Sequence, residues 1–125
     1  MTSETHRVLD KPLMSFDIAH ELEEMKAGEQ WKTSHRGAKT LAKNEDVRLV
    51  LVALSKGMTV HEHQAEGPIT VSVAEGSIRF IARGEERTLA RGALLTLGAG
   101  IAHQVDALED SAFVVTVIQP HHAQR

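Results

Sequence analysis

The stretch that decides the fold runs from Gly57 to Gly76 and reads Gly-Met-Thr-Val-His-Glu-His-Gln-Ala-Glu-Gly-Pro-Ile-Thr-Val-Ser-Val-Ala-Glu-Gly. It contains two short runs rich in β-branched residues, Thr59–His63 and Ile69–Glu75, with the turn residues Glu-Gly-Pro between them. Such runs, separated by glycine and proline, are typical of strands rather than helices. The stretch therefore predicts two strands of one β-rich domain.

Similar runs fill the chain on both sides of this stretch. After Gly37 no helical period returns, and short apolar segments alternate with glycine or charged turns. Many short strands at near-regular spacing predict an antiparallel sandwich or barrel rather than repeated β–α–β units. Beside the two strands above, we expect strands at Ala38–Ala42, Val47–Lys56, Ser77–Ala82, Glu86–Ala90, Ala93–Leu97, Ala102–Asp106 and Ala112–Ile118.

A short amphipathic helix is predicted ahead of the strands. Ile18, Leu22 and Met25 have the spacing of one helix face, and a glycine after them supplies a stop. Ser15 or Asp17 can cap the free amides at the start. We accordingly divide the chain into an N-terminal arm and short helix over residues 1–45, packed on or exchanged with a barrel over 46–120, and a flexible tail over 121–125.

Composition excludes several classes of function. The 125 residues allow one ordinary domain, and the absence of cysteine excludes a disulfide framework, a zinc finger and a thiol nucleophile. Fourteen basic against 17 acidic residues leave a net charge of −3, so no basic face for nucleic acid is expected. No signal-peptide core and no membrane-spanning stretch is evident, which predicts a cytoplasmic protein without membrane contact.

Histidines are the polar residues most able to carry chemistry. His61 and His63 are two residues apart in a strand-like run, which predicts that both side chains lie on one face. His103 follows a glycine-rich turn and can return beside them on a distant strand. Three imidazoles would suit a divalent transition metal such as zinc, iron, nickel, copper or manganese. The alternative is a metal-free polar lining of an apolar barrel.

Two motifs in this region resemble those of the cupins, which are small double-stranded β-helix (jelly-roll) barrels. The first cupin motif is written G-x5-H-x-H-x3-4-E-x6-G, and Gly57, His63 and Gly76 fit it at the stated spacing. The second histidine of the motif then falls on Ala65, and its glutamate falls on Ile69.

The second cupin motif is written G-x5-P-x-G-x2-H-x3-N. Gly92, Gly100 and His103 fit it, whereas Gly98 replaces the proline and Ala107 replaces the asparagine. Agreement with both motifs at once implies an all-β cupin jelly-roll barrel with a short N-terminal helix and arm. The resemblance also implies that His63 and His103 occupy two of the four metal-ligand positions of the family.

The two altered ligand positions leave two hypotheses for function. In the first, the barrel binds a small apolar molecule without an intact catalytic metal site, in a pocket that includes Ile69, Val71, Glu66 and Phe113. In the second, the protein is a metal-dependent cupin enzyme of the dioxygenase or isomerase type. It would use a displaced site of His61, His63 and His103, with Glu66 as a possible acid or base. Whether the protein is an enzyme stays open at this point.

Assembly is the last expectation from the sequence. Small cupins that look like this one commonly form homodimers, often by adding an N-terminal strand to the sheet of the partner. The segment Ala38–Ala42 is the candidate for that exposed edge. The expected partners are therefore a second copy of the chain and a small-molecule ligand.

Overall fold

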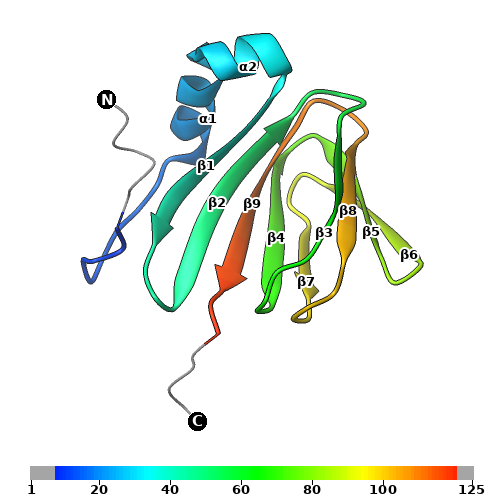
Figure 1. Cartoon of the computed structure of the whole chain (residues 1–125). Coiled ribbons are helices and arrows are strands. Elements are labelled where there is room, and N and C mark those ends of the chain that lie inside the picture. The colour runs from blue at the N-terminus through cyan, green and yellow to red at the C-terminus, as the bar shows by residue number, and fades with distance from the viewer. Residues whose placement is uncertain (1–7, 121–125) are drawn as a thin grey trace.

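A computed structural model describes residues 8–120 and shows a mostly β domain with two short helices (Figure 1). The helices precede all of the strands in the chain. They are α1 (Ile18–Ala27) and α2 (Glu29–Ser34). The strands are β1 (Arg36–Lys43), β2 (Val47–Leu54), β3 (Thr59–His63), β4 (Ile69–Glu75), β5 (Ser77–Ala82), β6 (Glu85–Ala90), β7 (Leu94–Leu97), β8 (His103–Ala107) and β9 (Ser111–Ile118).

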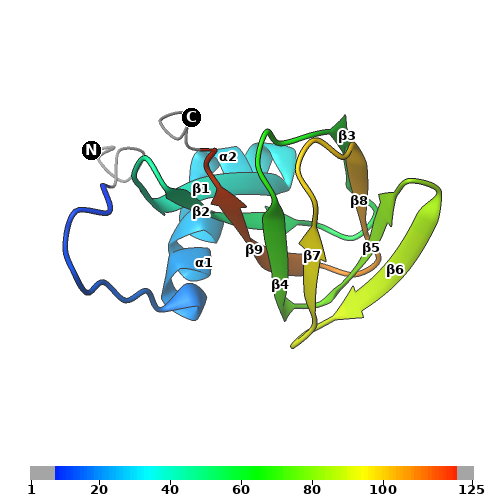
Figure 2. The same cartoon turned by 90° about the horizontal axis from the view of Figure 1, so that it is seen from below.

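The strands form two antiparallel sheets that face each other. One sheet has five strands in the order β1-β2-β9-β4-β7, and the other has four in the order β3-β8-β5-β6. Non-consecutive neighbours in both sheets, such as β2 beside β9, mean that the chain crosses repeatedly from one sheet to the other. This arrangement confirms the predicted all-β barrel architecture, and Figure 2 shows the same strands from below.

Strand alternation gives the five-stranded sheet two apolar faces. On β2, Val52 and Leu54 belong to the core between the sheets, whereas Leu51 and Ala53 belong to a second cluster on the opposite face. The second cluster is covered by Leu22 of α1, together with partly buried apolar residues of both helices. Because both faces of β2 are covered, its sequence is apolar almost throughout.

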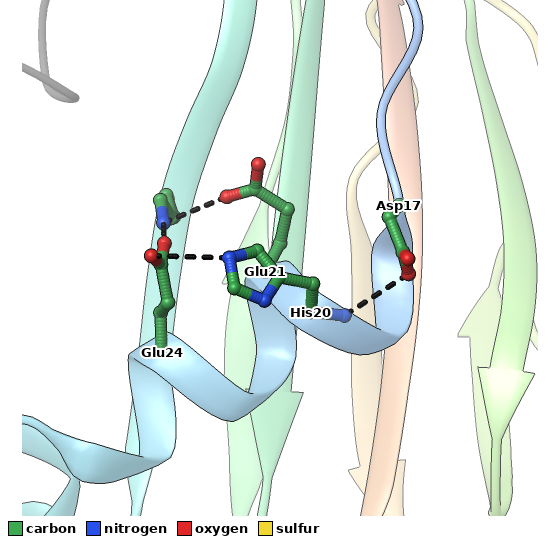
Figure 3. A network of polar contacts seen from close by, with 5 residues as sticks. Asp17, His20, Glu21 and Glu24 are labelled. Carbon is green, nitrogen blue, oxygen red and sulfur yellow. Dashed lines mark hydrogen bonds and ion pairs between the residues drawn. The ribbon is translucent and has the colours of Figure 1, made fainter.

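The helix α1 has the predicted ends. Asp17 is the N-cap, and its Oδ1 accepts a hydrogen bond from the amide of His20 at 3.1 Å (Figure 3). Gly28 follows the last turn. The second helix, α2, was not expected, because its sequence Glu-Gln-Trp-Lys-Thr-Ser has no repeated apolar spacing. No helix within residues 8–120 has the length and apolar character needed to cross a membrane.

An ion pair fixes α1 to the sheet beside the apolar contacts. The Nζ of Lys39 on β1 lies 2.7 Å from Oε1 of Glu21 and 3.3 Å from Oε1 of Glu24. Glu21 is buried, with 7% of its surface exposed, and Figure 3 shows it on the same side of the helix as Glu24. Burial acts to lower the pKa of Lys39, but its hydrogen bonds to the two carboxylates outweigh burial and raise that pKa. The lysine is therefore held in its charged form.

The predicted strands agree closely with those observed. Each of the nine lies within two residues of the observed bounds at both ends. The division at residue 45 stays a prediction, but β1 pairs with β2 from Arg36 to Lys43 and so belongs to the larger sheet. The predicted tail 121–125, with His121 and His122, lies outside the described residues.

Candidate functional site

A cavity of ≈ 320 Å³ lies between the two sheets. Its wall is mainly apolar, with Val60, Val105 and Phe80 from the smaller sheet facing valines of β2 and β9. Ile69, Val71 and Phe113, which were expected in the pocket, all line it. The full lining is Ala38, Arg48, Val50, Val52, Val60, His63, Gln64, Ala65, Ile69, Val71, Phe80, His103, Val105, Phe113, Val115 and Val117.

Two histidines meet at this cavity. His63 and His103 are directly paired across β3 and β8, and their ring centroids are 4.3 Å apart. Their positions in the sequence are 40 residues apart, so the antiparallel pairing of β3 with β8 is what brings them together. The two residues that fit the cupin motifs thus lie side by side, as the motif spacing predicts.

His103 is the buried member of the pair. Only 4% of its surface is exposed, and its ring stacks on Phe80 with centroids 5.3 Å apart. Burial lowers the pKa of His103, the carbonyl of Ile101 raises it in part, and the neighbouring His63 lowers it further, with a net fall. His103 Nδ1 lies 3.0 Å from the Ile101 carbonyl oxygen, which can only accept, so Nδ1 donates. The neutral ring therefore leaves Nε2 as an acceptor at the cavity wall.

The mouth of the cavity is marked by the lining residues that are exposed. These include Arg48, His63 and Gln64. Gln64 Nε2 donates to the carbonyl of Gly100 at 2.8 Å, and the amide of Gly100 donates to the carbonyl of Ala65 at 2.9 Å. These two bonds join the segment after β3 to the segment before β8. The mouth is therefore framed by two loops fixed to one another.

The strand β3 is held in place on both of its sides. Thr59 Oγ1 donates to Oδ1 of Asp106 on β8 at 3.0 Å. The guanidinium of Arg36 on β1 donates to the carbonyl of Thr59 and so joins the edges of the two sheets. The hydrogen bonds of Asp106 with Gln104, Thr59 and Arg79 outweigh its burial and lower the pKa of this carboxyl. The position of His63 is thus supported by β3 rather than left to a free loop.

His61 and Glu66 do not join the other predicted site residues. Both are exposed, and neither lines the cavity. The register of β3 shifts between Val60 and His63, and these two residues both line the cavity although they are three apart. This bulge interrupts the two-residue alternation from which a shared face for His61 and His63 was predicted. The structure therefore brings together His63 and His103 without His61.

The cavity offers fewer metal-binding side chains than the four ligand positions of the cupin motifs. Ala65 and Ile69, at the remaining two ligand positions of the motif, both line the cavity but carry no donor atom. Within residues 8–120, no group of three or more His, Cys, Asp or Glu side chains is placed to hold a metal ion. Two imidazoles alone do not fit the three or four protein ligands usual for transition metals.

Several lining residues were not predicted from the sequence. Arg48 is in a strand whose two faces are both apolar, so periodicity alone does not tell which face it shares. Its pairing with Val117, in register with Val50 and Val115, places it on the cavity face. Phe80 was not predicted as a pocket residue, because a phenylalanine in a strand is most simply explained as part of the core. Gln64 lies after the bulge, where alternation no longer applies.

No protein-family model and no curated protein sequence matches the chain. Solved structures do match. A cupin superfamily protein from Desulfitobacterium hafniense is 15% identical with a TM-score of 0.67, over 70% of this chain and 80% of that one. A cupin-2 domain containing protein from Shewanella frigidimarina is 16% identical with a TM-score of 0.66, over 83% and 94% of the two chains. The domain has the cupin fold.

A larger protein shares the fold over more of the chain. Salicylate 1,2-dioxygenase from Pseudoaminobacter salicylatoxidans is 11% identical with a TM-score of 0.76, over 94% of this chain and 36% of that one. At these identities the likeness concerns the fold, and cupin domains host many unrelated reactions. The function of the cavity therefore depends on its own residues.

Proposed function

We propose that this cupin domain binds a small, mainly apolar molecule in the cavity between its sheets. The observation that carries the proposal is the chemistry of the four motif positions. His63 and His103 lie together at the cavity, while Ala65 and Ile69 add apolar surface there. Burial of apolar surface drives binding in such a pocket, and a few polar groups orient the ligand.

The size of the cavity supports a small ligand. Its ≈ 320 Å³ lies near the lower end of the range for small-molecule sites. A second cavity, of ≈ 210 Å³, is lined by Arg83, Glu85 and Arg87 beside Leu95 and Leu97 and contains neither histidine. We therefore place the ligand in the larger cavity, with the imidazoles of His63 and His103 as its polar contacts.

The second candidate is a metal-dependent cupin enzyme. Two observations favour it. The ring centroids of His63 and His103 are only 4.3 Å apart, and the fold is similar to that of salicylate 1,2-dioxygenase. It would require a further donor, for which the sequence offered His61. That residue is exposed and outside the cavity lining, so the apolar-ligand proposal accounts for more of the observed residues.

Metal content and ligand binding together test the proposal. Untagged protein, purified without chelators or nickel resin, is analysed by elemental mass spectrometry beside a His63→Ala variant. We expect no stoichiometric transition metal in either protein, and a higher melting temperature on addition of an apolar probe such as indole. A metal at one equivalent that disappears in the variant would instead support the metal-dependent enzyme.

We further propose a homodimer formed through the outer edge of β1. This strand is at the end of the five-stranded sheet, and among the described residues its outer edge is met only by a parallel bridge from Val8 to Lys43. An unpaired strand edge can be extended by a second copy. Light scattering during size exclusion at micromolar concentration is expected to give twice the monomer mass, and a monomer mass would contradict the proposal. The cytoplasmic location stays a prediction.

A further inference from the structure

Arg48 adds a positive charge to a cavity whose wall is otherwise mainly apolar. Among the described residues, it is the only fully charged side chain that lines the cavity, and none of the lining residues carries a carboxylate. Within residues 8–120, its guanidinium has no hydrogen bond or ion pair. A cation without a counter-charge at the mouth of an apolar pocket attracts an anionic group on whatever enters the pocket.

The register of the larger sheet fixes how Arg48 faces the cavity. Arg48 is paired with Val117, and Val117 is also paired with Ile69 on β4. All three residues line the cavity, so the arginine is next to an apolar surface formed by β9 and β4. The stem of an arginine can cover such a surface while its guanidinium stays in water. The charge is then available at the rim rather than buried inside.

The two kinds of polar group at the cavity differ in what they can bind. His103 is nearly fully buried, so an anionic group placed against it would lose its hydration. Arg48 is exposed at the mouth and offers paired N–H donors that match the two oxygens of a carboxylate. An anionic group is therefore expected at the mouth, with the apolar part of the same molecule inside.

We propose that the ligand is an amphipathic carboxylate, with an apolar body in the cavity and its carboxylate on the guanidinium of Arg48. This inference rests on the proposed function, because it assigns a charge to the ligand of the same cavity. Medium-chain fatty acids and small aromatic acids share this chemistry. The apolar wall accommodates either body, whereas the arginine selects the charged group.

The test uses two probes of the same length that differ in charge, octanoate and octanamide. Their dissociation constants are measured by calorimetry on the full chain and on Arg48→Gln, with Arg91→Gln as the matched control. Arg91 is exposed and lines neither cavity, so this control removes the same charge elsewhere. We expect wild-type protein and Arg91→Gln to bind octanoate about tenfold more tightly than octanamide, and Arg48→Gln to bind both about equally.

The possible outcomes distinguish the carboxylate inference from the apolar-ligand proposal. Equal binding of both probes to wild-type protein would overturn the carboxylate inference and leave the apolar-ligand proposal standing. Failure of both probes to bind would overturn the two proposals together. A preference for octanoate that persists in Arg48→Gln would assign the anion to another group and overturn the inference.

Two further measurements keep the test decisive if Arg48→Gln does not fold. Arg48→Lys retains the positive charge and should keep part of the preference for octanoate. In wild-type protein the preference should shrink between about 0.02 and 0.5 M salt, because an exposed charge is screened. A preference that does not change with salt would contradict a contact with the exposed guanidinium.

The location of the probe is checked separately. Chemical shifts of the His63 and His103 rings, followed by NMR, report whether the probe is in this cavity.

Discussion

The imidazole of His103 stacks on the ring of Phe80, with the two planes only 12° apart. Both residues are on the smaller sheet, where His103 pairs with Ala82 and Phe80 pairs with Val105. This stacking, together with burial, keeps the imidazole away from water. His103 is therefore both a polar residue of the cavity and a part of the packed core.

A first prediction concerns pH. Because burial lowers the pKa of His103 in the folded protein below its usual value of about 6.5, the unfolded chain binds this proton more readily. The free energy of unfolding should then fall as pH drops from about 6.5 to the lowered pKa, and His103 adds no further dependence below that. Urea unfolding of wild-type protein and His103→Gln, in buffer with a chelator, measures this. Identical pH slopes in both proteins would contradict the prediction.

A second prediction tests the motif positions by restoring their donors. The double variant Ala65→His, Ile69→Glu places two ligands beside His63 and His103 in the cavity. We expect it to bind one equivalent of zinc or manganese, since four nitrogen and oxygen donors then converge. Because Ile69 is 4% exposed, a glutamate there without metal should lower the free energy of unfolding by several kcal/mol.

Added metal should recover much of the stability that the double variant loses, because binding to the folded state alone stabilises it. The single variant Ala65→His provides the control, since it lacks the carboxylate. Isothermal calorimetry and thermal unfolding measure binding and stability separately. A folded double variant that binds no metal would show that these positions do not converge as the motif implies.

A third prediction concerns the contact between α1 and β1. Glu21→Gln removes the charge that faces Lys39 at 2.7 Å while keeping the size of the side chain. The expected loss is about 1–3 kcal/mol, because the remaining partner of the partly buried ammonium, Glu24, is half exposed. Glu23→Gln, on the exposed part of the same helix, should change stability by no more than about 0.5 kcal/mol. Equal effects in chemical denaturation would refute a specific role for Glu21.

A fourth prediction separates backbone strain from a steric clash. Gly76 and Gly84 both have a φ of +77°. A Cβ on Gly84 would meet no atom within 4 Å, whereas one on Gly76 would clash with the carbonyl of Asp110 and with Ser111. Gly84→Ala should therefore cost about 1–2 kcal/mol, and Gly76→Ala should cost about 1–3 kcal/mol more. Denaturant midpoints measure the difference, and equal losses would exclude the clash.

The strands could be predicted from the sequence because the turns between them have strong local signals. Gly57 and Gly76, which bound the first motif, have φ of +88° and +77° and so occupy positions that favour glycine. The pairing of His63 with His103 followed from two motifs whose spacing matches the strand pattern. Local chemistry and long-range pairing agree here, which is why the architecture was predictable.

The remaining features depend on information that local sequence does not carry. The bulge before His63 depends on how β3 pairs with β8, and it separates His61 from the cavity. The orientation of Arg48 depends on the register of β2 with β9. The helix α2 has no buried residue and no apolar period, so only the packing of its Trp31 against the second apolar cluster distinguishes it from a loop. Each of these is set by tertiary pairing rather than by propensity.

The position of Trp31 decides what an optical experiment on this protein can observe. It is the only tryptophan of the chain, and it packs in the cluster beneath the helices, on the opposite face of the larger sheet from the cavity. The ammonium of Lys26 lies 5.3 Å from the centre of its ring. Intrinsic fluorescence therefore reports whether the helices are docked, and a ligand could fill the cavity without altering the emission. A reporter of binding would have to be introduced on the inner face, for example as Phe80→Trp.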